Sequence, residues 1–256
     1  MKIVLLGSGN LATQIGRALK MAGQNILQVW SRQPENAFQL ADLLHVPAAK
    51  SLAEIDRTAD LYIIAVTDDA IKEVATSLSI TDKIIVHTSG STDLSILEGA
   101  SDKIGVFYPL QTFTKNKSVD FRQIPIGIEA NTAEVLNAIR SLAERLSENV
   151  IDMDSHKRRT LHVAAVFACN FTNHLWVLAQ ELLKESNQDF NLLRPLIAET
   201  AANVQLTNPI NLQTGPAVRN DEEVLNKHLH LLEGNLNLHE LYHKLSQSIV
   251  KFDKPV

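Results

Sequence analysis

Cysteine is almost absent from the chain. Its 256 residues include one cysteine, Cys169, so an intrachain disulfide is excluded. A single thiol fits a reducing compartment, and we expect a cytoplasmic protein. Because Cys169 lies in a largely apolar stretch, we interpret it as an inert core thiol rather than a nucleophile.

The chain also lacks an excess of positive charge and a long apolar run. Lys and Arg number 24 against 29 Asp and Glu, which gives a formal net charge of −5. This balance gives no electrostatic reason to expect a nucleic acid or a membrane as a partner. No run approaches the roughly 18 apolar residues of a membrane span. The apolar stretch of the opening MKIVLLGSGN is too short for a signal peptide.

The first half of the sequence alternates short apolar runs with helical patterns. Strands are expected at 2–6, 25–30, 61–66, 83–87, 103–108, 124–130 and 149–152, and helices at 10–21, 34–44, 69–78 and 133–147. Alternation of this kind predicts an α/β fold with a parallel, doubly wound sheet of the Rossmann type.

The second half contains no convincing strand. We expect one long helix over 155–185, further helices at 189–206, 221–232 and 236–252, and an ordered loop at 208–221. The predicted domains are therefore a nucleotide-binding domain at 1–153 and an all-helical domain at 154–256.

The segment GSGNLA (7–12) directly follows a predicted strand and opens a predicted helix, which is the context of a dinucleotide-binding loop. Gly7 permits the tight turn, and Gly9 lets the backbone approach a pyrophosphate. Free N–H groups at the helix N-terminus favour binding of the phosphates. The loop residues expected to contact the cofactor are Gly7, Ser8, Gly9, Asn10 and Leu11.

The end of the second predicted strand lacks an acidic residue. An NAD-specific site carries Asp or Glu about 20 residues after the glycine loop, where it binds the ribose 2′-hydroxyl. This chain has Trp30-Ser31-Arg32 instead, and a hydroxyl with a guanidinium suits a 2′-phosphate. We therefore expect NADP as the cofactor, bound through Ser31 and Arg32. The alternative for Arg32 is a solvated surface charge.

Two further loops, AVTDDA (65–70) and HTSGS (87–91), follow strands at the sheet edge where ligands bind. We expect Val66, Thr67 and Asp68 on the nicotinamide-ribose side of the cofactor. Thr88, Ser89 and Gly90 are expected to offer hydroxyls and N–H groups near the reacting carbon, with Thr88 beside the cofactor. The alternative, in which Asp68, Ser89 and Ser91 cap the following helices, is equally open.

Seven segments occur together: GSGNLA, WSR, AVTDDAI, HTSGS, GVFYPLQTF (105–113), FACNFTNHL (167–175) and TGPAVRND (214–221). In this order they resemble a family of Rossmann-like proteins related to pyrroline-5-carboxylate reductase and to the deazaflavin-dependent NADP reductases. The resemblance covers nearly the whole chain. It implies an NADP-binding fold, a helical domain that forms a homodimer, and an oxidoreductase activity without a defined substrate.

A lysine of the wider superfamily is missing. The related 6-phosphogluconate and 3-hydroxyisobutyrate dehydrogenases carry a lysine four residues before an asparagine on the first long helix of the second domain. Here Val166 precedes Asn170 and Cys169 precedes Asn173 at that spacing. Reduction of an imine or carbonyl is therefore easier to explain than lysine-assisted oxidation of an alcohol.

The long predicted helix carries most of the remaining catalytic candidates. At 100° per residue, His162, Cys169 and Asn173 lie within about 40° of one stripe, with Asn170 beside it. His162 is the candidate proton donor, and the two asparagines are candidates for orienting a carbonyl or carboxylate. The alternative for all three is hydrogen-bonded packing between helices.

Residues outside that helix complete the predicted substrate site. Tyr108 and Gln111 follow a strand and are expected to border the same cleft. Arg219, in the loop TGPAVRND, is a candidate clamp for an anionic substrate. The alternative is a loop-stabilising ion pair with Asp221 or Glu222.

The segment HELYH, His239 to His243, matches the HExxH pattern of zinc peptidases, in which Glu240 would be the general base. No His, Cys or Glu follows His243, so a third ligand would have to come from His228, His230 or Glu233, and only by folding back. The apolar spacing around the motif favours an ordinary amphipathic helix. We expect no metal site and keep a zinc peptidase as a remote alternative.

Together these features predict an NADP-dependent oxidoreductase. It transfers hydride between NADPH and a small imine or carbonyl substrate in the interdomain cleft, and it forms a homodimer through the helical domain. The main alternative is a non-catalytic NADP(H)-binding sensor or regulatory module.

Overall fold

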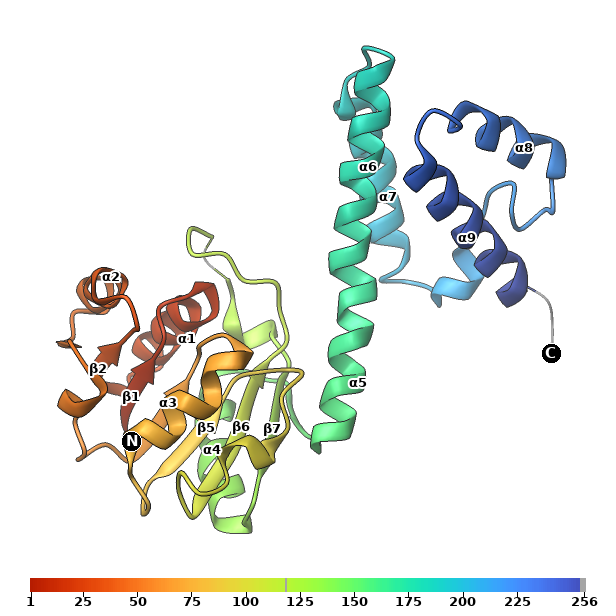
Figure 1. Ribbon diagram of the computed structural model, residues 1–256. Helices are drawn as coiled ribbons and strands as arrows, with labels where there is room; N and C mark the ends of the chain where they lie inside the picture. The colour runs from red at the N-terminus through yellow and green to blue at the C-terminus, as the bar shows by residue number, and fades with distance from the viewer. Residues whose placement is uncertain (118, 254–256) are drawn as a thin grey trace. The chain divides into compact units, whose positions relative to one another are not determined.

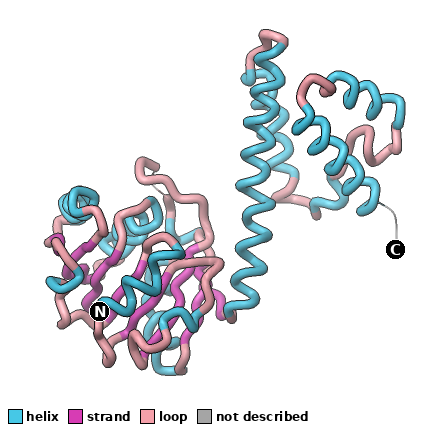
Figure 2. The backbone as a smooth tube through the Cα atoms, in the orientation of Figure 1, coloured by secondary structure: helices cyan, strands magenta, loops and turns pink. Residues whose placement is uncertain are grey.

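The computed structural model describes residues 1–117 and 119–253 and divides into two compact units, Met1–Cys169 and Asn170–Val256. The first unit contains a sheet flanked by helices, whereas the described part of the second contains helices and loops without strands (Figures 1 and 2). The division falls inside the long helix Ser155–Glu185. The first unit therefore holds the strands expected for 1–153 together with the beginning of that helix.

Among the described residues the sheet has eight strands in the order β3-β2-β1-β4-β5-β6-β7-β8. They are β1 (Lys2–Leu6), β2 (Asn25–Trp30), β3 (Ala48–Ala49), β4 (Leu61–Ile64), β5 (Ile84–His87), β6 (Lys103–Pro109), β7 (Ile126–Ala130) and β8 (Val150–Asp152). The chain leaves β1 on one side for β2 and returns on the other side for β4. In doubly wound sheets such a reversal opens the ligand crevice at the carboxyl ends of the strands.

The predicted fold class is confirmed, but the last two strands run against the others. β7 pairs antiparallel with β6, and β8 pairs parallel with β7. A parallel pair needs a crossover connection, usually helical, and an antiparallel pair does not. The described part of the β6–β7 connection contains only the short 3-10 turn Phe121–Gln123. The missing helix before 124–130 was therefore the sequence signal for this reversal.

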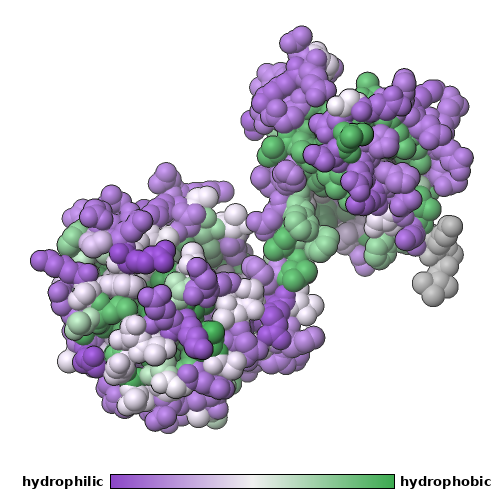
Figure 3. All heavy atoms as spheres, viewed as in Figure 1, coloured by the Kyte–Doolittle hydropathy of each residue, from purple (hydrophilic) through white to green (hydrophobic). Residues whose placement is uncertain are grey.

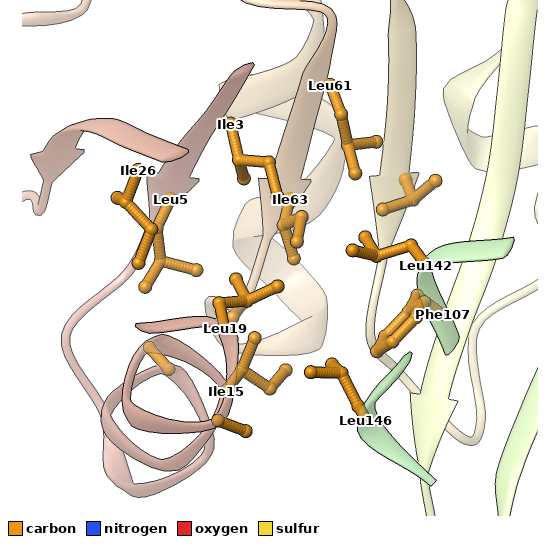
Figure 4. Close-up of a cluster of buried hydrophobic side chains, with 14 of the residues drawn as sticks. Ile3, Leu5, Ile15, Leu19, Ile26, Leu61, Ile63, Phe107, Leu142 and Leu146 are labelled. Carbon is orange, nitrogen blue, oxygen red and sulfur yellow. The ribbon is translucent and has the colours of Figure 1, made fainter. Parts of the chain in front are cut away.

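Helices cover both faces of the sheet, because alternate residues of its central strands point to opposite sides. Ile3 and Leu5 of β1 join a core formed with α1 (Asn10–Met21), α2 (Pro34–Leu44) and α4 (Ala133–Leu146) (Figure 4). Val4 and Leu6 join a second core formed with α3 (Ile71–Leu78). Burial on both faces explains why this strand reads as an unbroken apolar run.

The long helix is continuous, as predicted, but it is not regular. It consists of α5 (Ser155–Ala165), a π-helical turn at Val166–Phe171 and α6 (Thr172–Glu185). Single π turns inside α-helices are frequent at functional sites. Apolar periodicity alone does not reveal such a turn.

The second unit continues with α7 (Arg194–Asn203), α8 (Glu222–Leu231) and α9 (Leu236–Asp253). Ala217 and Leu232 are the buried apolar side chains in its described part. Apolar and polar residues mix on the face drawn in Figure 3. By length and composition, Ser155–Glu185 is apolar enough to cross a membrane, and its apolar window is 0% buried. Exposed apolar surface of this extent needs a covering surface.

Candidate functional site

The glycine loop, the end of β2 and the loop after β4 line a cavity of about 460 Å³ at the carboxyl ends of the strands. Most residues predicted to bind the cofactor lie in its wall: Gly7, Ser8, Gly9, Asn10, Leu11, Ser31, Arg32, Val66 and Thr67. Trp30, Leu52 and Val74 add apolar surface. A larger cavity of about 630 Å³, between α1 and the ends of α2 and α4, contains none of these residues. The smaller cavity is therefore the candidate cofactor site.

The two glycines of the loop have different structural roles. Gly7 has φ +129°, and a Cβ there would lie 2.1 Å from the carbonyl oxygen of Ala65, so only glycine fits. A Cβ on Gly9 would meet nothing within 4 Å. Helix α1 follows Gly9 and has no acidic residue in its first turn. The loop therefore presents open space and unpaired helix N–H groups to an anion.

Ser31 and Arg32 border the same cavity from the end of β2. Ser31 is buried, and its Oγ accepts a 2.7 Å hydrogen bond from Ser8 Oγ. Arg32 is exposed at the rim. Hydrogen bonding by Thr67 and, more weakly, the charge of Arg32 lower the pKa of Asp69.

Two predicted cofactor residues, Asp68 and Thr88, do not line the cavity. Asp68 is exposed and accepts a hydrogen bond from Ser91 Oγ. Thr88 is buried, and its hydroxyl donates to the carbonyl oxygen of Ile64 at 3.3 Å. Both side chains connect the end of β4 to the end of β5.

The hydroxyl of Ser89 is engaged within its own loop. Its Oγ accepts hydrogen bonds from the N–H groups of Ser91 and Thr92 at 3.1 and 3.0 Å, and donates to Thr92 Oγ1 at 2.9 Å. These contacts favour a structural role within the loop over a catalytic role. The expected alternative, a helix cap, is not observed for Ser89, because Asp93 caps the following 3-10 turn.

His87, the last residue of β5, is a buried neutral imidazole. Its Nδ1 accepts a hydrogen bond from the N–H of Ser89 at 3.2 Å. Burial, with a smaller contribution from the charge of Arg158, lowers the pKa of His87 to about 4. The loop after β5 therefore depends on the unprotonated form of this side chain.

Three residues from separate elements meet beside the end of β5. Tyr108 OH and His162 Nδ1 are 3.1 Å apart, and their rings lie edge to face. A Cβ on Gly90 would lie 2.6 Å from His162 Nδ1 and 2.8 Å from Tyr108 Cζ. Burial raises the pKa of Tyr108, so the phenol stays protonated at neutral pH. The predicted proton donor, His162, thus has a hydrogen-bonding partner inside the first unit.

The polar stripe predicted on the long helix is not regular. The π turn at Val166–Phe171 has i→i+5 hydrogen bonds, so the 100° per residue assumed for the stripe does not hold there. Cys169 is exposed, and its assignment as a core thiol is wrong. Asn170 and Asn173 are exposed residues of the second unit, whereas His162 belongs to the first.

Arg219 lies exposed in the loop before α8. Within the described part of the chain it forms no ion pair with Asp221 or Glu222. Asp221 instead caps α8 by accepting a hydrogen bond from the N–H of Val224 at 3.2 Å. The guanidinium therefore stays a candidate ligand for an anion.

The HELYH segment lies within α9. Glu240 pairs with Lys244 at 2.7 Å, and His243 lies 3.0 Å from Gln247 Nε2. In residues 1–117 and 119–253, no group of three or more His, Cys, Asp or Glu is placed to hold a metal ion. The contacts are those of a solvated helix face.

Sequence reasoning missed one buried residue beside this site, Arg158. In SHKRRT it resembles a solvated helical turn, yet it is 0% exposed and paired with Glu129. The available signal was weak: Glu129 is the one acidic residue in the strand IPIGIEA. A buried acid in a strand calls for a cationic partner.

Two family models match the chain. Residues 2–90 match "NADP oxidoreductase coenzyme F420-dependent", and residues 124–249 match a domain of unknown function, DUF2520. A crystal structure of a candidate NADP oxidoreductase from Bacteroides fragilis is 43% identical, with 98% of both chains covered and a TM-score of 0.91.

More distant structures share the fold. A 1-pyrroline-5-carboxylate reductase from Streptococcus pyogenes is 15% identical, with 98% of both chains covered and a TM-score of 0.65. An imine reductase from Myxococcus stipitatus, in complex with NADP+, is 16% identical over 98% of this chain and 94% of its own, with a TM-score of 0.63. Comparison with curated proteins gives no match.

Proposed function

Because the chain belongs to the NADP oxidoreductase family in which this nucleotide-binding domain is joined to DUF2520, we propose that it binds NADPH and reduces a small imine or carbonyl compound. The family resemblance expected from the motifs is thereby confirmed. The observation that carries the proposal is the meeting of Gly90, Tyr108 and His162 one strand away from the glycine-loop cavity. The imine and pyrroline-5-carboxylate reductases that share the fold support the choice of substrate class.

The residues present fit NADP. The open side of Gly9 and the start of α1 suit the pyrophosphate. Ser31 accepts from Ser8 and so keeps its own hydroxyl hydrogen for a phosphate oxygen, while Arg32 supplies a cation at the rim. When bound, NADPH supplies the hydride.

Arg32→Glu is expected to weaken NADPH binding by roughly 100-fold and NADH binding by less than about 3-fold, because the change repels a 2′-phosphate that NADH lacks. Fluorescence titration with both cofactors measures this. Arg57→Glu is the matched control, since Arg57 is exposed and donates to the carbonyl of Ser79, outside the cavity. Equal losses for NADPH and NADH would show that Arg32 is a surface charge.

Proton transfer is assigned to His162, with Tyr108 as the group that orients it. Because His162 Nδ1 is hydrogen-bonded to the Tyr108 hydroxyl, Nε2 is the ring nitrogen that can hydrogen-bond to a substrate atom. In the protonated ring, the phenol oxygen accepts from Nδ1–H, and Nε2–H is the proton to be transferred. Reduction of a C=N or C=O bond needs one such proton on nitrogen or oxygen. A lysine is not required for it, which agrees with Val166 and Cys169 at the superfamily lysine position.

The decisive experiment measures loss of NADPH absorbance with cyclic imines, keto acids and aldehydes. His162→Asn is expected to lower kcat by about 10²- to 10⁴-fold, because a positioned proton donor is lost. Tyr108→Phe is expected to lower it about 10-fold through the lost hydrogen bond. NADPH affinity stays unchanged in both variants. Tight NADPH binding without turnover of any compound would support the sensor alternative instead.

The described part of the second unit has almost no core of its own, which supports a homodimer. Its buried apolar side chains are Ala217 and Leu232, whereas Leu192 and Leu196 are 66% and 64% exposed. A unit of this size without a buried core is not stable in isolation. We infer that a second copy of the chain covers these apolar helices through an isologous interface.

Sedimentation equilibrium tests the dimer, which is expected at twice the 28.3 kDa chain mass. Leu196→Glu is expected to give monomers by burying a charge in the interface. Glu199→Gln, on the same helix α7, is the matched control. A monomeric wild-type chain, or flotation with lipid vesicles through the apolar helix Ser155–Glu185, would contradict this assignment.

A further inference from the structure

Arg158 is the largest of the fully buried side chains in the described part of the chain. Its Nη1 pairs with Glu129, and its Nη2 donates to the carbonyl oxygen of Thr92 at 2.5 Å and to Ser155 Oγ at 3.1 Å. Ser155 Oγ also bonds both carboxylate oxygens of Glu129, at 3.0 and 2.9 Å. Desolvating an ion pair is costly, so a buried pair is weak grounds for a purely stabilising role.

This network connects the elements that carry the proposed catalytic residues. Thr92 belongs to the same loop as Gly90. Glu129 lies on β7, which pairs with the strand of Tyr108. Arg158 lies one helical turn before His162 on α5. The same side chain therefore links α5 to the β5 loop and, through Glu129, to the strand that pairs with that of Tyr108.

The contact between Arg158 and Glu129 lies close, along both elements, to the contact between His162 and Tyr108. Glu129 is paired with the residue two positions before Tyr108, so their side chains share one face of the sheet about 7 Å apart along the strand. Arg158 and His162 are four residues apart, so they share one face of α5 about 6 Å apart along its axis. The contact of Arg158 with Glu129 therefore lies one strand repeat from Tyr108 and one helical turn from His162.

We propose that Arg158 is a positioning residue, which sets the hydrogen bond between His162 and Tyr108 by fixing α5 against β7 and the β5 loop. Its effect on turnover rests on the proposed reductase function. Its effect on the His162–Tyr108 geometry does not, and that geometry is measurable without a substrate.

The test is a double-mutant cycle in the full chain. The ¹H–¹³C NMR signal of the His162 ring is assigned by its loss in His162→Asn. The change in its chemical shift caused by Tyr108→Phe is then measured in the wild-type and in the Arg158→Met backgrounds. Tyr108→Phe is expected to displace the signal clearly in the wild type, and at least about 3-fold less when Arg158 is absent. Arg159→Met is the matched control, because Arg159 is the next residue and makes an exposed ion pair with Asp93.

Arg158→Lys keeps a charge for Glu129 but lacks the second arm of the guanidinium that reaches Thr92, and it is used if Arg158→Met does not fold. In the Arg158→Lys background, Tyr108→Phe is expected to displace the His162 signal by an amount between those seen with arginine and with methionine at position 158. An equal displacement with and without Arg158 would overturn the proposal. If the displacement is smaller without Arg158, as expected, but the protein binds NADPH and reduces no compound, the positioning role is supported and the reductase function is rejected. For an active enzyme, Arg158→Lys lowers kcat with an unchanged NADPH dissociation constant.

Discussion

Gly9→Val is expected to abolish NADPH binding while leaving the fold intact. A side chain at residue 9 enters open space, since a Cβ there has no atom within 4 Å, and φ is an ordinary −72°. In dinucleotide-binding loops of this kind, that space is where the pyrophosphate approaches the start of the helix. Filling it is expected to weaken binding at least about 100-fold, which corresponds to roughly 2.7 kcal/mol. NADPH fluorescence titration gives the affinity, and the thermal melt gives the stability.

Gly7→Ala is the contrasting variant two residues away. Here the Cβ would lie 2.1 Å from the carbonyl oxygen of Ala65 at a φ of +129°, so the backbone of β1 or β4 has to move. We expect a loss of several kcal/mol in the free energy of unfolding, from strain and disrupted packing. Wild-type NADPH affinity in a folded Gly9→Val protein would show that the glycine loop is only a tight turn.

The fold was largely predictable because its signals are local. The apolar run at 2–6, the glycine loop and the following amphipathic helix each specify one element, and the observed elements lie close to the predicted bounds. The reversal of β7 was harder, because strand direction depends on the connection rather than on the strand. The π turn had no local signal and altered the expected geometry of Cys169, Asn170 and Asn173.

The candidate cofactor cavity was predictable for the same reason, whereas the contact between the proposed catalytic residues was not. Gly7, Ser31 and Thr67 each follow a strand whose end is visible in the sequence, and parallel strands bring their ends to one edge. Tyr108 and His162 are 54 positions apart, so their contact depends on the packing of α5. No propensity or motif encodes that packing, and the residue that we infer to set it, Arg158, has the sequence pattern of a solvated surface.

His87 is expected to make the protein less stable as the pH falls from about 6.5 to about 4. Its pKa is lowered from 6.5 to about 4, first by burial and second by the charge of Arg158. Between these values the unfolded chain binds a proton that the folded protein excludes, so stability is lost on acidification and constant above about pH 6.5. The full difference is about 3 kcal/mol, of which about 2 kcal/mol is lost by pH 5. Urea unfolding at several pH values measures this slope.

His87→Asn isolates this residue, because an amide does not titrate and its oxygen offers the N–H of Ser89 an acceptor. The variant is expected to lose most of the slope between pH 6.5 and 4. Asp93 does not confuse the result: its pKa is lowered to about 2, so its stabilisation is lost only as the pH falls below about 3.8. His230→Gln is the control. Hydrogen bonding to Glu233 raises the pKa of this exposed histidine, so its titration changes stability with pH in the opposite direction to that of His87. A wild-type slope in His87→Asn would mean that the loop after β5 accepts a protonated His87, and the neutral histidine would then not be what holds the N–H of Ser89.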